Sequence, residues 1–450
     1  MKPRKPQPSR HDDLFRMKLD QLISQQHELY RLANMIDWQA CEDRFGGFYA
    51  EKGRPGIPVR LMVGLEYLKQ MFNVSDEVAV AHWVENPYWQ YFCGAEYFSH
   101  ELPINPSQMT RFRQRIGEAG CEWLLQLTIQ AGLATKTVHA SSLQVVNVDT
   151  TVQEKAIAFP TDARLYHKAR ATLVRHARKM NIDLRQSYTR VGKWTLTQHS
   201  GYARAAQFNR ARREQKKLKT YLGRVIRDIE RKATAAQMHS LRDLLEITQR
   251  IHRQQRHDNN KVYSVHAPEV ECIGKGKAHK RYEFGVKTSI VTTSKDNFIV
   301  GMQSLPTNPY DGHTLHAALL QSQRLTGILI REAYVDRGYK GHDVDHTQVW
   351  IAGTKRGVTP TIKRKLKRRN AIEPIIGHLK SDGRLSRNFL KGTLGDAMNA
   401  LLCGAGHNLR KILNRLRLFC ARKLSSLQTL FDWLLSSLSS FNPELWLFQG

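Results

Sequence analysis

The sequence predicts an α/β protein in which helices flank a mixed sheet. Apolar residues recur at helical spacing through most of residues 1–135, which predicts an all-α N-terminal domain. Short β-branched runs begin near residue 143 and resume after residue 261, as expected for buried strands. A strongly basic helical pattern lies between them, so residues 161–260 are expected to be a helical insertion into the sheet.

The composition points to a folded protein with a polyanionic partner. The 450 residues are 41% apolar and 24% charged, which is ordinary for two or three folded domains. Lys and Arg total 70 against 40 Asp and Glu, a formal charge of +30. Such a chain repels itself unless a polyanion neutralises it, so double-stranded DNA is the leading candidate partner.

Other classes are disfavoured by what the sequence lacks. No run of about 18 apolar residues predicts a membrane span, and the start MKPRKPQPSRHDD has no apolar signal-peptide core, so we expect a cytoplasmic protein with no membrane partner. The six cysteines are far apart without a C-x-x-C pair, which argues against a zinc site and against a disulfide framework.

In residues 1–135, three helices are expected after residue 53. The stretch GRPGIPVRLMVGLEYLKQMFNVSDEVAVAHWVENPYWQYFCG predicts two of them, with Ser75 as an N-cap, and Ser107 is expected to cap the third. Compact helices at this spacing suggest a helix-turn-helix type of DNA-binding module. Arg111, Arg113 and Arg115 on the third helix would then contact phosphates or base edges. The alternative is an ordinary solvated basic face.

Residues 136–160 begin the sheet domain. The run LQVVNVDTT predicts a buried strand that ends at Asp149. The insertion that follows, residues 161–260, holds 24 Lys and Arg against 8 Asp and Glu. We expect Lys216, Lys217 and Lys219 on its long helix to contact DNA phosphates. Trp194 in the same insertion is expected in a core, the alternative being a platform for an unpaired base.

Residues 261–410 are expected to complete the sheet. The segment from KVYSVHAPEV to GMQSLP predicts an antiparallel meander, HTLHAALLQSQRLTG a helix, and REAYVDRGYKG and QVWIAGT two further strands. A basic run then precedes Glu373 at a helix start. Residues 411–450 predict a helical C-terminal tail that packs on the body or on a second subunit.

Three acidic residues are candidate metal ligands. Asp149 and Asp336 are expected at strand ends, and Glu373 lies on the helix after the last strand. Carboxylates converging from separate elements can hold two Mg²⁺ ions about 4 Å apart, the arrangement that phosphodiester chemistry commonly uses. The surrounding basic residues, with Arg364, Lys365 and Arg368 among them, would cradle the DNA backbone.

The motifs D149-T-T, D336-R-G-Y and R369-N-A-I-E373-P-I-I-G-H-L-K380 together resemble the DDE transposases of bacterial insertion sequences, and within them the insertion-sequence-five family. NPYDGHT is also similar to that family, and the resemblance covers most of residues 45–410. It implies a ribonuclease-H-like catalytic core, with Asp149, Asp336 and Glu373 binding two Mg²⁺ ions that Mn²⁺ can replace. It also implies Arg369 and Lys380 beside the DNA phosphates, and cleavage and joining of DNA at the terminal inverted repeats.

The resemblance further implies a homodimer on DNA and a nucleoid-associated protein in a bacterial cytoplasm. The chain departs from the family pattern at Leu366, where relatives have a tyrosine. Two other functions remain open from the sequence. One is a plain Mg²⁺-dependent endonuclease, which would cut DNA without joining it. The other is a sequence-specific repressor or a domesticated transposase whose chemistry has been lost.

Overall fold

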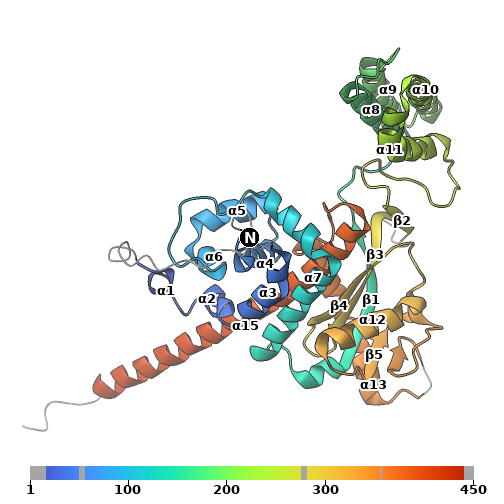
Figure 1. Ribbon diagram of the computed structural model, residues 1–450. Coiled ribbons are helices and arrows are strands. Elements are labelled where there is room, and N and C mark those ends of the chain that lie inside the picture. Colours follow the sequence, from blue (N-terminus) through green and yellow to red (C-terminus); the bar gives the residue numbers. More distant parts are fainter. Residues whose placement is uncertain (1–16, 50–55, 275–280, 355–356, 440–450) are drawn as a thin grey trace, which may run out of the picture.

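The computed structural model describes residues 17–49, 56–274, 281–354 and 357–439, with side chains through residue 418. It shows a mixed α/β architecture in which a central sheet is flanked by helices, and a separate helical bundle stands off one end of the sheet (Figure 1). The predicted α/β class is therefore confirmed.

The N-terminal region is helical, as predicted. Ser75 caps α5, since its hydroxyl accepts a hydrogen bond from the backbone N–H of Val78 at 3.2 Å. The expected cap at Ser107 is wrong: Ser107 is the first residue of α7, and Asn105 Oδ1 accepts from its backbone N–H at 3.0 Å. The helices are α1 (Leu19–Leu22), α2 (Glu28–Ala33), α3 (Trp38–Phe45), α4 (Val59–Phe72), α5 (Asp76–Glu85), α6 (Pro87–Phe92) and α7 (Ser107–Ala134), with the 3₁₀ turn η2 (Gly46–Phe48).

The helix α7 bends at Gly117. This residue has φ 63° and ψ −164°, a conformation outside the helical region that only glycine adopts without strain. The bend separates the arginine-bearing first part of α7 from its apolar second part. The second part packs against the C-terminal helix α15 (Gly392–Ser439).

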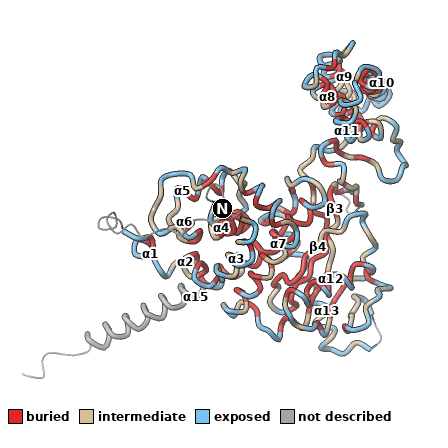
Figure 2. The backbone as a smooth tube through the Cα atoms, in the orientation of Figure 1, coloured by how far each residue is buried: buried red, intermediate tan, exposed pale blue. Residues whose placement is uncertain are grey.

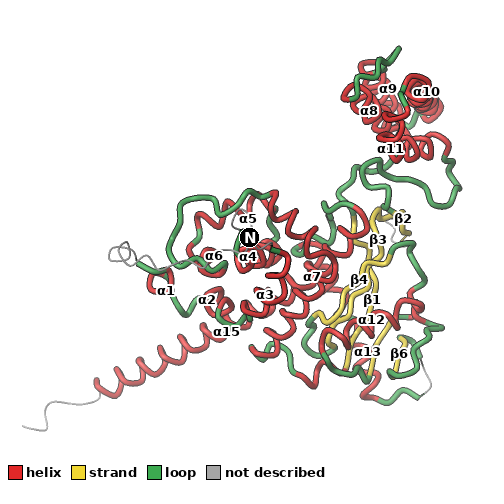
Figure 3. Tube along the Cα trace, viewed as in Figure 1, coloured by secondary structure: helices red, strands yellow, loops and turns green. Residues whose placement is uncertain are grey.

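In the described part of the chain the sheet has six strands. Strand order is β2-β3-β1-β5-β6, with β4 also paired to β3 (Figure 3). The pairs β2–β3, β3–β4 and β1–β3 are antiparallel, whereas β1–β5 and β5–β6 are parallel. The predicted meander and the two later strands are thus confirmed. The strands are β1 (Val145–Glu154), β2 (Glu271–Gly274), β3 (Tyr282–Thr293), β4 (Ile299–Leu305), β5 (Glu332–Val335) and β6 (Gln348–Ile351).

Strand β1 does not end at Asp149 as expected. It continues to Glu154 because Thr151, Val152 and Gln153 are all buried and pair with β3, so Asp149 lies in the middle of the strand. The other short elements of this region are the 3₁₀ turns η3 (Ala140–Gln144) and η4 (Arg337–Tyr339) and the helices α12 (Asp311–Thr326), α13 (Pro360–Arg369) and α14 (Ile372–Ser381).

One hydrophobic core joins the N-terminal helices, the sheet and α15, and we call this part the body (Figure 2). Helix α15 packs against α7, α4 and β4, so it connects the N-terminal region to the sheet. It runs without a break across residues 410 and 411, where we expected a separate tail to begin. Ile412, Leu413 and Leu416 are buried in the body core.

The insertion is a bundle of four helices with its own core, which confirms its helical character. Leu173, Leu222 and Leu245 are among the residues buried inside it. The bundle helices are α8 (Asp162–Lys179), α9 (Thr189–Arg204), α10 (Phe208–Lys232) and α11 (Ala235–Arg253). Neither these helices nor any other helix in the described part of the chain is long and apolar enough to cross a membrane.

Candidate catalytic site and nucleic-acid interface

The register of the parallel strands brings Asp149 and Asp336 to neighbouring positions. Strand β1 pairs with β5 through Asn147 opposite Tyr334. Two residues further along are Asp149, in the middle of β1, and Asp336, directly after β5, so the two residues are side by side where β5 ends. We call this place the sheet edge. The sequence predicted that these two aspartates lie close together, and the strand pairing supplies the reason.

Asp336 is held where β5 ends. It is the N-cap of η4, and its Oδ1 accepts a hydrogen bond from the backbone N–H of Gly338 at 2.9 Å. The side chain is half-buried. A strand followed at once by a capped turn thus fixes this carboxylate at the sheet edge.

Asp149 is held by an arginine from the other end of the sequence. The guanidinium of Arg369 donates to Asp149 Oδ2 at 3.3 Å, and Arg369 is only 8% exposed. Asp149 Oδ1 also accepts from the backbone N–H of Thr150 at 2.8 Å. Arg369 therefore lies beside Asp149, as predicted. It was expected to hold a DNA phosphate, whereas in this structure it contacts the Asp149 carboxylate.

Glu373 lies in the first turn of α14, as predicted, and its side chain is exposed. Helix α14 packs on β1, and Ile375 and Leu379 are buried on its core side. Glu373 follows Arg369 by four residues, and Asn370 and Ala371, both in the αR conformation, join α13 to α14 between them. Within the described residues, however, no three His, Cys, Asp or Glu side chains are close enough together to hold a metal ion.

Asp311 joins the two aspartates at the sheet edge, and the sequence reasoning did not identify it. It is the first residue of α12, and its Oδ1 accepts from Thr150 Oγ1 at 3.1 Å and from Lys287 Nζ at 3.0 Å. The signal was available, because NPYDGHT, which contains Asp311, is one of the stretches similar to the transposase family.

Tyr339 lies fully buried among these charges. Burial, followed by the negative charges of Asp149, Asp311 and Asp336, raises the pKa of Tyr339 well above its usual value, while Arg369 lowers it. The phenol therefore stays protonated and able to donate. Its hydroxyl has no hydrogen-bond partner among the described residues.

Lys380 is not beside the aspartates, which corrects the expectation that it holds phosphates next to them. Its ammonium group pairs with Glu283 at 3.1 Å, and Glu283 is 6% exposed. On β3, Glu283 is seven residues from Ile290, the partner of Asp149, which is about 20 Å along the strand. Lys380 therefore neutralises a buried carboxylate near the far end of β3.

The basic side chains of helix α13 differ in whether they contact other residues of the chain. Arg364 is exposed. Lys365 pairs with Glu332 at 2.7 Å, and Arg368 donates to the backbone carbonyls of Ser294 and Lys295. Arg368 is exposed as well, so of the three predicted DNA contacts here Lys365 and Arg368 are held by contacts within the chain and only Lys365 is half-buried.

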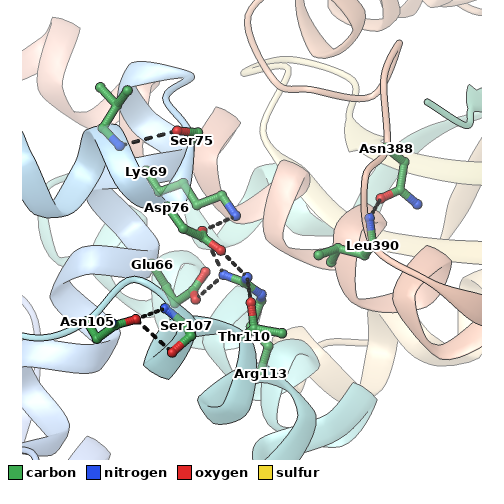
Figure 4. Close-up of polar contacts among 11 residues, drawn as sticks. Glu66, Lys69, Ser75, Asp76, Asn105, Ser107, Thr110, Arg113, Asn388 and Leu390 are labelled. Carbon is green, nitrogen blue, oxygen red and sulfur yellow. Dashed lines mark hydrogen bonds and ion pairs between the residues drawn. The ribbon is translucent and has the colours of Figure 1, made fainter. Parts of the chain in front are cut away.

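The three arginines of α7 also differ. Arg111 and Arg115 are exposed, as expected, but Arg113 is 2% exposed, so the prediction that it faces DNA is wrong. Its guanidinium contacts the carboxylates of Glu66 and Asp76, and Lys69 completes the network at 2.6 Å from Asp76 (Figure 4). Helical spacing turns Arg113 inward together with Met109 and Phe112, between its two exposed neighbours.

The network around Arg113 is held together by opposite charges. Burial would lower the pKa of Arg113, but Glu66 and Asp76 raise it above its usual value. Burial would likewise raise the pKa of Asp76, but hydrogen bonds and charge from Arg113 and Lys69 lower it. Arg113 is therefore committed to holding α7 against α4 and α5.

Two of the three bundle lysines predicted to bind DNA are exposed. Lys216 and Lys217 are exposed, although Lys217 also pairs with Glu214 at 2.7 Å. Lys219 is half-buried, with Nζ 5.9 Å from the centre of the Tyr166 ring. The expectation of a core position for Trp194 is wrong, since it is 65% exposed on α9.

A hollow in the same bundle is lined by four arginines. Its volume is about 920 Å³, and its walls include the stacked rings of Tyr188 and Tyr221, whose centres are 4.6 Å apart. Asp228 in its wall pairs with Arg231 at 2.6 Å. The arginines are Arg185, Arg224, Arg227 and Arg231.

Two of three comparisons with known proteins found a similar sequence. A family described as Transposase domain (DUF772) matches residues 17–115. Uncharacterized protein ORF8 in the nfe locus of Rhizobium meliloti is 54% identical over 208 residues, which are 46% of this chain and all of that protein. No solved structure gives a significant match. The chain therefore belongs to the transposase-domain (DUF772) family.

Proposed function

We propose that the chain is a DDE transposase of the insertion-sequence-five type, which binds the ends of its element, cleaves the DNA there and joins the ends to target DNA. One observation carries this proposal. A chain with a transposase domain has Asp149 on β1 beside Asp336, which directly follows the parallel strand β5, with Glu373 four residues after the arginine that contacts Asp149. The mixed sheet flanked by helices is consistent with a ribonuclease-H-like core.

The donor chemistry of the site fits Mg²⁺ or Mn²⁺, because hard divalent cations prefer carboxylate oxygens. Asp149, Asp336 and Glu373 would be the ligands. Two such ions would supply a metal-activated water and stabilise the charge that builds up on the phosphorus oxygens. The match between these residues and the metal ions rests on their carboxylate groups. In the described residues the three carboxylates do not form a group that could hold a metal ion.

The chain's own residues account for the rest of the proposed chemistry. Asp149 is fixed by β1 and by Arg369, and Asp336 by the capped turn η4, so both carboxylates are preorganised at the sheet edge. Arg369 has a second role available: its Nε has no hydrogen-bond partner among the described residues, so a phosphate oxygen could accept from it.

The DNA would be bound by exposed basic groups on three parts of the molecule. Arg111 and Arg115 on α7 would contact the terminal repeat, Arg364 on α13 would contact the backbone near the site, and Lys216 and Lys217 would contact phosphates along the bundle. We also propose a homodimer on DNA, and an enzyme that works on the nucleoid in a bacterial cytoplasm.

A DNA-binding repressor is the second candidate. The observation in its favour is that the described residues contain no ready group of three acidic, His or Cys side chains for a metal. Two of the aspartates at the sheet edge already pair with Lys287 and Arg369, an arrangement that a protein without chemistry would also tolerate.

The test is to incubate the full chain with Mg²⁺ and with labelled DNA from either side of its own gene. Joined products are the expected result. Nicks without joined products would identify a plain endonuclease. Specific binding without any cleavage would identify a repressor or a domesticated protein, and would overturn the proposal.

A further inference from the structure

Side-chain contacts fix Asp311 at the sheet edge. Among the described residues these contacts use one carboxylate oxygen, Oδ1. Thr150 Oγ1 and Lys287 Nζ both donate to Oδ1, at 3.1 and 3.0 Å. These donors come from β1 and β3, the two central strands. Lys287 also donates to the backbone carbonyl of Pro309 at 2.7 Å, which holds the loop before α12 in place.

Gly338 shows how closely Asp311 approaches Asp336. A Cβ atom placed on Gly338 would lie 3.1 Å from Asp311 Oδ2 and 3.1 Å from Asp336 Oδ1. Asp311 Oδ2 and Asp336 Oδ1 are therefore no more than 6.2 Å apart, which is the sum of these two distances. The missing side chain at residue 338 leaves the space between the two carboxylates open.

Tyr339 is a second, independent sign of a ligand at this place. Its side chain is fully buried, its hydroxyl has no partner among the described residues, and the charges that act on it are those of the three aspartates and Arg369. A buried donor without an acceptor destabilises the fold, so an oxygen bound between the aspartates would relieve that cost. Lys287 pairs with Asp311 and Arg369 with Asp149, so the cited ion pairs supply two cations beside three carboxylates.

We propose that Asp311 is a fourth acidic residue of the site and binds a divalent cation together with Asp336, with the Tyr339 hydroxyl donating to an oxygen bound there. This inference rests on the proposed function, because it places the cation at the same sheet edge. Mg²⁺ is commonly held by one or two carboxylates with water and substrate phosphates as its other ligands, so two aspartates are a sufficient protein contribution.

The competing explanation is that Asp311 only ties α12 to the sheet through Thr150 and Lys287. Asp311→Asn distinguishes the two, because an asparagine oxygen can still accept from both donors while the negative charge is lost. Gly338→Ala is a second variant. Gly338 does not have a positive φ, so alanine brings no backbone strain and its Cβ acts only on the two carboxylates.

The experiment is a calorimetric titration of the full chain with MnCl₂ in the absence of DNA. We expect Asp311→Asn to weaken Mn²⁺ binding by about tenfold or more, as Asp336→Asn does, and Gly338→Ala to weaken it by a smaller factor. Asp345→Asn is the matched control, since it removes an exposed carboxylate on the loop after η4, and it should bind like the parent chain. Circular dichroism without metal should show all four variants folded.

The outcomes separate the inference from the proposed function. Mn²⁺ binding that is lost in Asp336→Asn but unchanged in Asp311→Asn and Gly338→Ala would overturn the role of Asp311 alone. A parent chain that does not bind Mn²⁺ at all would overturn both this inference and the metal chemistry of the proposed function.

Discussion

Arg113 in the body and Lys216 in the α8–α11 bundle are both basic residues on long helices, but their surroundings are opposite. Arg113 is 2% exposed and contacts two carboxylates, whereas Lys216 is exposed. The same contrast holds more widely. Lys155, Lys287, Lys365, Arg369 and Lys380 in the body all pair with acidic side chains.

The bundle, by contrast, contains 24 Lys and Arg with only 8 Asp and Glu in residues 161–260, too few carboxylates to pair with its cations. Positive charge therefore has two functions in one chain. In the body it fixes helices and carboxylates in place. In the bundle it is available to a polyanion, and its contribution should depend on salt.

The largest effect that this comparison predicts is on stability. Arg113→Ala should lower the free energy of unfolding by about 3–5 kcal/mol, because it leaves the fully buried Glu66 without its cation and Asp76 with Lys69 alone. Arg111→Ala on the same helix is the control, because Arg111 is exposed, and it should change the free energy of unfolding by about 0.5 kcal/mol or less. Urea denaturation measures both. Equal, small effects would show that the buried network does not hold the body together.

The next effect concerns a buried histidine in the body. Burial lowers the pKa of His407 to about 3, with Arg410, Lys411 and His378 nearby, while a hydrogen bond to the Asn297 carbonyl raises it. Below the usual pKa of 6.5 the unfolded chain binds the proton and the folded chain does not, so stability falls as the pH falls. From pH 7 to pH 5 this histidine should cost about 2 kcal/mol.

The difference between the parent chain and His407→Gln isolates this effect. Burial raises the pKa of Asp396 to about 6, so this residue makes the folded chain more stable as the pH falls, opposite to His407. The stability of the parent chain alone therefore shows only the sum of the two effects. Denaturation at several pH values should give a steeper loss towards acid in the parent than in the variant. His316→Gln, at an exposed site on α12, is the control. Parallel pH profiles for parent and His407→Gln would contradict the assignment.

In the bundle the expected effect is on DNA binding, with no change in folding. Replacing Lys216, Lys217 and Lys219 with glutamine should reduce the salt dependence of binding to random DNA by up to about 2–3 in the log–log slope. Lys219 should contribute least, because it is half-buried beside Tyr166. Lys18→Gln, at a lysine paired with Glu96 in the body, should leave the slope unchanged. An unchanged slope in the triple variant would mean that this face is only solvated.

The smallest expected effect concerns specificity. Arg111→Ala with Arg115→Ala should lower the preference for end DNA over random DNA by about 1 kcal/mol or more, and affect random DNA less. Competition binding with the two DNAs measures this preference. Equal losses on both DNAs would mean that α7 only contacts phosphates.

The sequence predicted the elements well but not which face each charged residue occupies. The presence of the strands, the meander and a helix start beside Glu373 follow from local patterns, and the structure confirms them, although β1 runs past its predicted end. The inward turn of Arg113 and the distant pairing of Lys380 with Glu283 depend on contacts between segments far apart in sequence. Asp311 was missed for the same reason, since only the sheet brings α12 to β1 and β5.

The central claim is that Asp149, Asp336 and Glu373 act as one catalytic site on DNA. The most direct measurement is the yield of cleaved and joined DNA with Mg²⁺ for Asp149→Asn, Asp336→Asn and Glu373→Gln, alongside their affinity for end DNA. The account predicts that each variant binds DNA like the parent but neither cleaves nor joins, because each change keeps the shape and removes the charge that the cations need. Full activity in Glu373→Gln would contradict it.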